Sequence, residues 1–259
     1  MKKNLVVQGL WIGGRLSLLD QLSLKSFMAN GYEYHLYVYD DVKDVPVGVV
    51  VKDANEIIPE SEVYKNRYTT LEYSYFGFSD YFRVKLIYDK GGFWADTDII
   101  CLKHFDFQDD YIFSSEISTV ENGVASSLFK CPKNSVFLKE MCNEIRSNPL
   151  EKTDRGNILY MFPEYIKKYG FENYLKDSKI FSIFNKKNIA SIISKEYNED
   201  FYDECYSVHL LRQCWAWNRD RIKGEKDGIK KQIMLNSILD INKIYSEKTP
   251  YGSWQRKYL

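Results

Sequence analysis

Two aspartates, Asp96 and Asp98, follow an apolar run in the sequence GGFWADTDII and are separated by one threonine. An isolated charge in a buried strand is costly, so it must be ion-paired, hydrogen-bonded or bound to a metal. Because side chains alternate along a strand, both carboxylates are expected on one side of a single strand over 93–100. Such hard oxygen donors suit Mg²⁺ or Mn²⁺. Alternatively, the acids only cap a turn or pair with Lys103 or Arg83.

A helix is expected immediately before this strand, in the segment SDYFRVKLIYDKGG, with Ser79 as its N-cap and Gly91 at its end. Asp80 and Arg83 are spaced i, i+3 in this segment, so they share a face of the helix. They form either a surface ion pair of little energetic value or a polar pair that hydrogen-bonds a sugar.

Strand-like and helix-like segments alternate along the chain, which indicates an α/β fold with an at least partly parallel sheet. A helix capped by Ser17, with Asp20 in its first turn and Gly31 at its end, follows the first strand. Strands are expected over 4–12, 33–39, 48–51, 93–100, 111–116, 123–131 and 205–211, and further helices over 135–148, 158–170 and 228–245. No repeat or linker divides the sequence, so a single domain over 1–259 is expected.

The composition narrows the classes of function. The 36 basic and 36 acidic residues balance, so no overall charge favours nucleic acid. The five cysteines contain no CxxC pair, which argues against a disulfide framework or structural zinc and fits a reducing compartment. No apolar run is long enough to span a membrane, so a cytoplasmic location is expected. The basic and aromatic run over 219–259 is either a solvated helix face or a contact with the inner membrane surface.

The segment FSDYFRVKLIYDKGGFWADTDI resembles the S-D-x-x-R, G-G-x-aromatic-x-D-x-D core of glycosyltransferase family 32 and its relatives. These include yeast initiating mannosyltransferases, bacterial capsule and O-antigen transferases, and the glucosyltransferase domains of clostridial toxins. The resemblance implies a GT-A fold, in which a Rossmann-like nucleotide-binding half merges with an acceptor-binding part. It also implies metal-dependent transfer from a nucleotide-diphosphate sugar with retention of configuration.

The resemblance also assigns roles to the polar residues of this segment. It implies that Asp98 binds the metal and that Asp96 assists through the metal or the ribose. Asp80 and Arg83 would position the donor sugar. The cofactor would be Mn²⁺ or Mg²⁺, which neutralises charge on the departing diphosphate.

Three other segments are similar to parts of the same family. In GLWIGG the resemblance implies that Trp11 stacks on the nucleotide base beside Gly13, although a buried core tryptophan is the alternative. In SVHLLRQCWAW it implies that His209 is a further metal ligand or a diphosphate contact, the alternative being a core histidine. Leu211 stands where many relatives have an aromatic residue. In SSEISTVENGV, Glu116 and Asn122 are candidates for the sugar pocket or ordinary turn residues.

The expected reaction is transfer of a hexose from a nucleotide sugar, UDP-galactose or UDP-glucose first, to an oligosaccharide or lipid-linked saccharide of a capsule or O-antigen. Two other classes of function remain open. One is a metal-dependent phosphoryl-transfer enzyme, which would not need Trp11 or the pair of Asp80 and Arg83. The other is a carbohydrate-binding protein without catalysis.

Overall fold

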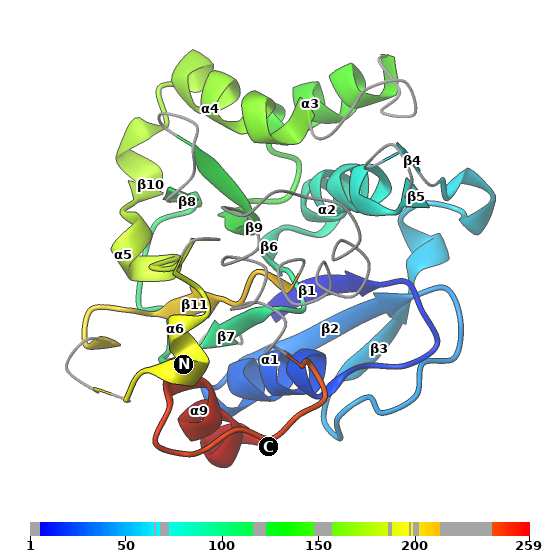
Figure 1. Cartoon of the computed structure of the whole chain (residues 1–259). Coiled ribbons are helices and arrows are strands. Elements are labelled where there is room, and N and C mark those ends of the chain that lie inside the picture. The colour runs from blue at the N-terminus through cyan, green and yellow to red at the C-terminus, as the bar shows by residue number, and fades with distance from the viewer. Residues whose placement is uncertain are drawn as a thin grey trace, which may run out of the picture.

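The computed structural model describes residues 6–64, 66–67, 73–115, 123–147, 157–185, 188–196, 198, 202–212 and 240–259. Within these residues a seven-stranded sheet runs in the order β10-β8-β9-β6-β1-β2-β3 (Figure 1). Its strands are β1 (Val6–Trp11), β2 (Glu33–Val38), β3 (Val50–Asp53), β6 (Gly92–Ala95), β8 (Ile112–Ser115), β9 (Val124–Cys131) and β10 (Leu175–Lys176).

The sheet is mixed, with a parallel half. Strand β1 pairs in parallel with β2 and β6, β2 pairs in parallel with β3, and β10 pairs in parallel with β8. Strand β9 is antiparallel to both β6 and β8. The order β3-β2-β1-β6 is that of the first four strands of a nucleotide-binding Rossmann sheet. The predicted α/β class with a Rossmann-like half is confirmed.

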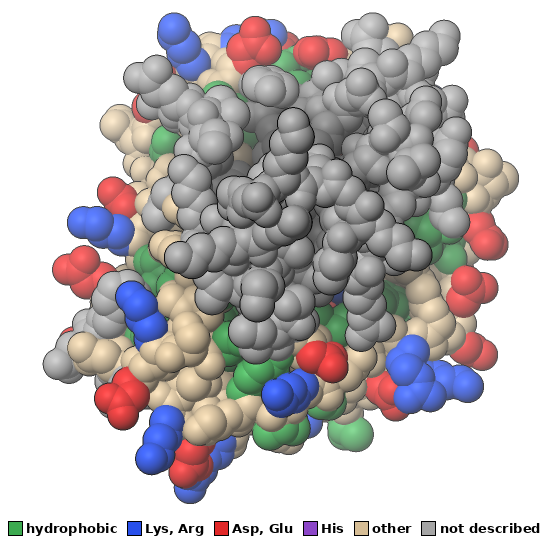
Figure 2. Space-filling view, in the orientation of Figure 1, with side chains coloured by type: hydrophobic (Ala, Val, Ile, Leu, Met, Phe, Trp, Pro, Cys, Tyr) green, Lys and Arg blue, Asp and Glu red, His purple; other side chains and the backbone are tan. Residues whose placement is uncertain are grey.

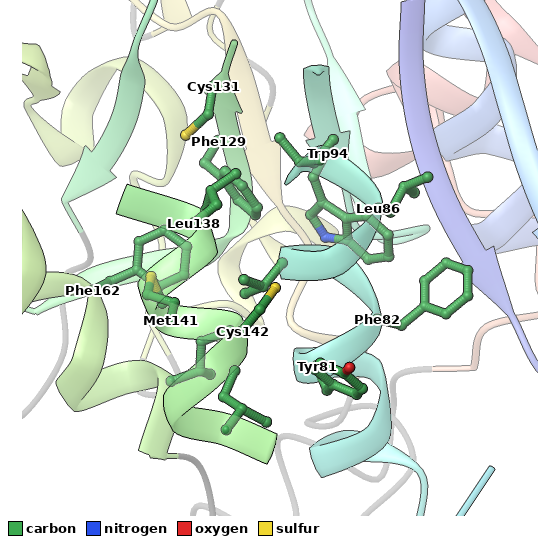
Figure 3. Packing of buried hydrophobic residues seen from close by; sticks show 14 of the residues in the cluster. Tyr81, Phe82, Leu86, Trp94, Phe129, Cys131, Leu138, Met141, Cys142 and Phe162 are labelled. Carbon is green, nitrogen blue, oxygen red and sulfur yellow. The ribbon is translucent and has the colours of Figure 1, made fainter. Parts of the chain in front are cut away.

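Helices cover both faces of the sheet (Figure 1). On one face Phe93 lies in an apolar cluster with side chains of α1. On the other face Trp94 lies in a cluster with side chains of α2, α3 and α4, and Figure 3 shows its indole beside Leu86 of α2. The bounds are α1 (Leu18–Ala29), α2 (Phe76–Lys90), α3 (Val136–Ser147) and α4 (Asn157–Tyr169).

Short elements complete the described fold. In the described part of the segment after β3 lie the 3₁₀ turns η1 (Ala54–Glu56) and η2 (Glu60–Glu62) and the antiparallel strands β4 (Asn66–Arg67) and β5 (Tyr73–Ser74). The later elements are η4 (Glu172–Tyr174), α5 (Ser178–Phe181), α6 (Ser191–Ser194) and α9 (Pro250–Tyr258).

Helix α1 begins and ends near the residues that the sequence indicated. Ser17 is its N-cap and Asp20 lies in its first turn, as the sequence predicts, and the structure adds that the two residues form a capping box. Asn30 is the C-cap, and Gly31 follows in the left-handed region.

The predicted start of α2 is wrong, whereas its predicted end is confirmed. The helix begins at Phe76 rather than after Ser79, and no side chain caps it. The apolar residues at its start explain the difference, since Phe78 is fully buried against the rings of Tyr39 and Tyr64. Gly91 ends the helix as expected.

The expected single strand over 93–100 is also wrong, because the chain turns at the two acids. Strand β6 ends at Ala95, and β7 (Ile99–Cys101) leaves the main sheet to pair antiparallel with β11 (Ser207–His209). The backbone N–H of Ile99 donates to the carbonyl of Asp96 at 3.1 Å, which closes the turn. Aspartate favours such turns, so local chemistry outweighs the apolar run around it.

The described C-terminal residues pack into an apolar cluster of the fold. Most of the helix expected over 228–245 falls outside the described residues, and 240–245 are not helical. Tyr251 and Trp254 of α9 are buried in an apolar cluster that also contains Leu22 of α1. These aromatic side chains are therefore not available to a membrane surface. Among the described residues, no helix has the length and apolarity to cross a membrane.

Charges of both signs are interspersed around the rim of the face shown in Figure 2, where the described side chains are visible. This mixture matches the balanced composition of the chain. A ligand that carries charge therefore depends on local groups rather than on a broad field.

Gly91 connects α2 to β6 in a conformation that other residues rarely adopt, with φ 71° and ψ −178°. A Cβ at this position would lie 2.7 Å from the backbone nitrogen of Lys133. We expect Gly91→Ala to lower the free energy of unfolding by about 1–3 kcal/mol from backbone strain, and further from the clash. Denaturant unfolding measures the loss.

Gly170→Ala is the matched control for this substitution. Gly170 also has a positive φ, 67°, but a Cβ there meets no atom within 4 Å. Its substitution should cost only the strain, about 1 kcal/mol. Equal losses in the two variants would contradict a role for the close approach to Lys133.

Candidate active site

The turn Asp96–Asp98 lies at the carboxyl edge of the parallel half of the sheet. Trp11 ends β1 and Asp96 directly follows β6, and these two strands are parallel neighbours, so both residues lie at the same edge. In open α/β sheets, ligands bind outside this edge. His209 also reaches the turn, because it is the cross-strand partner of Ile99 where β7 begins.

Asp96 is held by Arg83 of α2 and by Trp94 of β6. The indole Nε1 of Trp94 donates to Asp96 Oδ1 at 2.7 Å, and Arg83 Nη1 lies 3.2 Å from the same oxygen. The Arg83 guanidinium also lies over the Trp94 ring, 5.1 Å from its centroid. The position of this carboxylate is thus set by two side chains that are themselves packed in the core.

The guanidinium nitrogens of Arg83 all have hydrogen-bond or ion-pair partners within the protein. Its Nη2 lies 3.2 Å from Asp80 Oδ1, and its Nη1 donates to the carbonyl of Ser126 at 2.9 Å. Its Nε and Nη2 also donate to the carbonyl and hydroxyl of Ser79, both at 3.2 Å. The pair of Asp80 and Arg83 is therefore a buried network joined to Asp96, not a surface ion pair.

Asp98 is held from the C-terminal part of the chain. Its Oδ2 lies 3.3 Å from His209 Nε2 and accepts the backbone N–H of Arg212 at 2.8 Å. The other ring nitrogen of His209, Nδ1, lies 3.4 Å from Ser127 Oγ. The segment after β11 therefore closes over the turn.

Asp96, Asp98 and His209 form a group that suits a divalent cation. One ligand atom from each lies within 4.8 Å of the other two. Adjacent ligands of an octahedral Mg²⁺ site are about 3 Å apart, given metal–oxygen distances of about 2.0–2.1 Å, which is close to the spacing of His209 and Asp98. Two carboxylates and an imidazole also match the ligand preferences of Mn²⁺. The residues present fit a divalent metal.

The two acids of the turn have different electrostatic environments. Burial raises the pKa of Asp96, which Arg83 offsets only in part, while the nearby charge of Asp98 raises it further. Burial also raises the pKa of Asp98, but His209 and Arg212 outweigh it and leave that pKa below its usual value. Asp98 is therefore the more readily ionised of the two acids.

Trp11 is covered on one face by Arg212. The guanidinium lies 4.5 Å from the centroid of the indole, as in a cation–π contact. The indole Nε1 is buried without a hydrogen-bond partner among the described residues. A Cβ at Gly13 would lie 3.3 Å from that nitrogen, so the glycine lets the loop after β1 pack tightly against the ring.

The structure brings most of the predicted residues together. Asp80, Arg83 and Asp96 share one network, Asp98 and His209 are in contact, and Trp11 and Gly13 adjoin Arg212, whose backbone reaches Asp98. Glu116 and Asn122 lie outside the described residues, so their predicted contact with the sugar stays a prediction.

Two residues of this site were not found as functional candidates from the sequence. Arg212 carries no motif signal, and Asp20 is explained by its position in the first turn of α1. In the structure Arg212 Nη1 lies 2.7 Å from Asp20 Oδ1. Burial raises the pKa of Asp20, against the lowering effect of the Arg212 charge. The sequence identified Asp20 as an acid of the first helical turn, but nothing local indicated its distant partner.

A family model for the glycosyltransferase sugar-binding region containing the DXD motif matches residues 19–118. This range contains Asp80, Arg83, Asp96 and Asp98. The chain is a glycosyltransferase by this match, which lies within residues 19–118. The match assigns no role to any single residue, and Trp11 and His209 lie outside it, so the predicted roles of all the site residues remain predictions.

Solved glycosyltransferase structures resemble this transferase at low sequence identity. The PaToxG glycosyltransferase is 14% identical, with 63% of this chain and 68% of that chain covered and a TM-score of 0.44. GlyE of Streptococcus pneumoniae TIGR4 is 10% identical, with 93% and 62% covered and a TM-score of 0.46. An active-site mutant of LgtC is 11% identical, with 89% and 94% covered and a TM-score of 0.40.

The transferase spans 62% of the GlyE chain that it matches. No curated protein sequence matches it significantly.

Asp80 makes the stability of the glycosyltransferase depend on pH in an unusual direction. Burial raises its pKa to about 6, with Arg83 lowering it and Asp96 raising it. A raised folded-state pKa means that the carboxyl stabilises the fold at low pH, and that this contribution is lost as pH rises from about 4 through 6. We expect Asp80→Asn to gain stability relative to the parent by about 2 kcal/mol between pH 4 and pH 7.

Urea unfolding of the two proteins at both pH values, with EDTA present, measures this difference. Arg83 keeps Asp96 and Ser126 as partners in the variant, so it is not left unpaired. A stability difference between Asp80→Asn and the parent that is the same at both pH values would contradict the raised pKa.

Proposed function

We propose that this enzyme transfers a hexose from UDP-glucose or UDP-galactose to a saccharide acceptor, with retention of configuration, in the synthesis of a surface polysaccharide. It acts as a single GT-A domain over 1–259, with Mn²⁺ or Mg²⁺ as cofactor. The observation that carries this proposal is the group of Asp96, Asp98 and His209 at the carboxyl edge of the parallel strands. The acceptor is an oligosaccharide or a lipid-linked saccharide of a capsule or O-antigen.

Asp98 and His209 are the proposed metal ligands, and Asp96 shares the metal or binds the ribose. A divalent cation held there supplies Lewis-acid stabilisation of the charge that develops on the leaving diphosphate. The low pKa of Asp98 supports its role, because a ligand carboxylate must be ionised. His209 is held at Nδ1 by Ser127, which directs Nε2 toward Asp98.

Asp80 and Arg83 have different proposed roles in binding the donor sugar. Arg83 spends its donors on Asp80, Asp96 and backbone or hydroxyl oxygens, and only 7% of its side chain is exposed. It therefore orients the two carboxylates rather than contacting the sugar itself. Asp80 retains an oxygen that can accept a hydrogen bond from a sugar hydroxyl.

Trp11 is the proposed platform for the nucleotide base. A flat indole at the end of a strand offers stacking to any base. In the reaction that we propose, the acceptor hydroxyl attacks the anomeric carbon on the face from which the diphosphate leaves. A diphosphate oxygen takes the hydroxyl proton as the bond from carbon to diphosphate breaks.

A thermal-shift panel tests the donor and the metal together. UDP-glucose, UDP-galactose, UDP-N-acetylglucosamine and GDP-mannose are each added with Mn²⁺. A ligand at 100 times its Kd stabilises the fold by about 2.7 kcal/mol, so a true donor raises Tm clearly above that of Mn²⁺ alone. We expect Asp98→Asn to lose this metal-dependent shift and the transferase activity while keeping the Tm of the metal-free protein.

The same change at Asp110, which is exposed, is the control and should leave both the shift and the activity intact. Full transferase activity in EDTA, or in the Asp98→Asn variant, would exclude the metal role. A panel in which no nucleotide sugar adds to the effect of Mn²⁺ would reject the proposed donors.

A further inference from the structure

Asp20 is a buried acid that accepts four hydrogen bonds. Its side chain has no exposed surface. Oδ2 accepts the backbone N–H and the hydroxyl of Ser17, at 2.8 and 2.5 Å. Oδ1 accepts the hydroxyl of Thr97 at 3.1 Å and Nη1 of Arg212 at 2.7 Å. One carboxylate therefore has two edges, and each edge faces a different part of the molecule.

The Oδ2 edge has a local purpose, which is to complete the capping box at the start of α1. The Oδ1 edge contributes nothing to that cap. Its two partners lie 77 and 192 residues further along the chain. Capping alone therefore does not account for the burial of this charge.

Both partners of the Oδ1 edge belong to the proposed metal site. Thr97 is the central residue of the turn, and its bond to Asp20 holds its side chain toward α1, between the two ligand acids. Arg212 donates its backbone N–H to Asp98 and lays its guanidinium over Trp11. Asp20 thus links the loop after β1, the acidic turn and the segment after β11.

We propose that Asp20 is a positioning residue that assembles the metal site by holding Thr97 and Arg212 through one carboxylate edge. This inference rests on the proposed function, since it takes Asp96, Asp98 and His209 as the metal ligands. Asp20 itself touches neither metal nor substrate. Its effect is on the orientation of the turn and on the arginine whose backbone binds Asp98.

The donors around Asp20 make its charge, and not only its size, essential. Each edge meets one group that can only donate, the backbone N–H of Ser17 at Oδ2 and the guanidinium of Arg212 at Oδ1, so both carboxylate oxygens must act as acceptors. An asparagine has nearly the same shape but would place its NH₂ group against Ser17 or against Thr97 and Arg212. In either orientation the NH₂ group faces a group that can only donate, the Ser17 N–H or the Arg212 guanidinium, so that hydrogen bond is lost, and Arg212 loses its ion-pair partner.

Matched variants separate the two edges. Ser17→Ala removes the hydroxyl of the capping box and leaves the Oδ1 edge intact, so it should lower Tm by a few degrees without changing the affinity for Mn²⁺. Asp20→Asn should lower Tm and also weaken Mn²⁺ binding at least tenfold. Calorimetric titration of the whole chain with Mn²⁺ alone gives the affinity, and it is independent of any donor or turnover.

Thr97→Val and Arg212→Met each remove one partner of Oδ1 and keep Asp20 in place, so they test the inference even if Asp20→Asn does not fold. Each should weaken Mn²⁺ binding severalfold. The double variant of Asp20→Asn and Arg212→Met should bind no more weakly than Asp20→Asn, because both changes break the same contact. If the losses of Mn²⁺ affinity in the two single variants multiply in the double variant, the two changes do not act through one contact, and the inference is overturned.

Two further results of the Mn²⁺ titrations would contradict the inference in different ways. If Asp20→Asn binds Mn²⁺ as tightly as Ser17→Ala does, or if Thr97→Val and Arg212→Met both do, Asp20 only caps the helix. The inference then fails while the proposed metal site stands. If the parent protein itself does not bind Mn²⁺, the proposed metal site fails and this inference fails with it.

Discussion

The contact of Asp96 with Arg83 and Trp94 ties the active site to the hydrophobic core. An ionised carboxylate among apolar side chains is tolerated only when it is paired and hydrogen-bonded. Both partners are buried side chains, and Figure 3 shows Trp94 packed among the residues of α2 and α3. The packing that stabilises the sheet and its helices thus also fixes the carboxylate. A repacking of α2 against β6 would displace the acid even if no polar residue changed.

The charges at the carboxyl edge leave a cation binding site rather than a neutral cluster. Asp80 and Asp96 share the single charge of Arg83, and Asp98 contacts His209, so the carboxylates outnumber their cationic partners even if the imidazole is counted as one. Arg212 is itself paired with Asp20. Among the described residues the net charge at this edge is therefore negative, in a protein whose overall formal charge is zero. The pKa of Asp96 is raised and that of Asp98 is lowered, so the two acids respond differently to a cation. Asp98 is already ionised when the cation arrives, whereas the positive charge of the cation favours ionisation of Asp96.

The sequence predicted those parts of the site that depend on neighbours along the chain. Asp80, Arg83, Asp96 and Asp98 belong to one helix and the turn that follows it, so their spacing largely determines their proximity. Even there, alternation along a strand was the wrong reason for the convergence of the two acids, because the chain turns between them. Ser79 shows the same limit, since a residue with good capping chemistry became a hydrogen-bond partner of Arg83 once Phe78 was buried.

The remaining parts depend on contacts between residues far apart in the sequence, and local patterns cannot reveal them. His209 reaches the turn only because β11 pairs with β7, outside the main sheet. Asp20 is instructive because its local explanation was correct and complete for one of its oxygens. A carboxylate has two edges, however, and capping uses one. Since the charge is fully buried, the second edge needed a partner from elsewhere in the fold, so the burial of a capping acid is itself a sign of a second role.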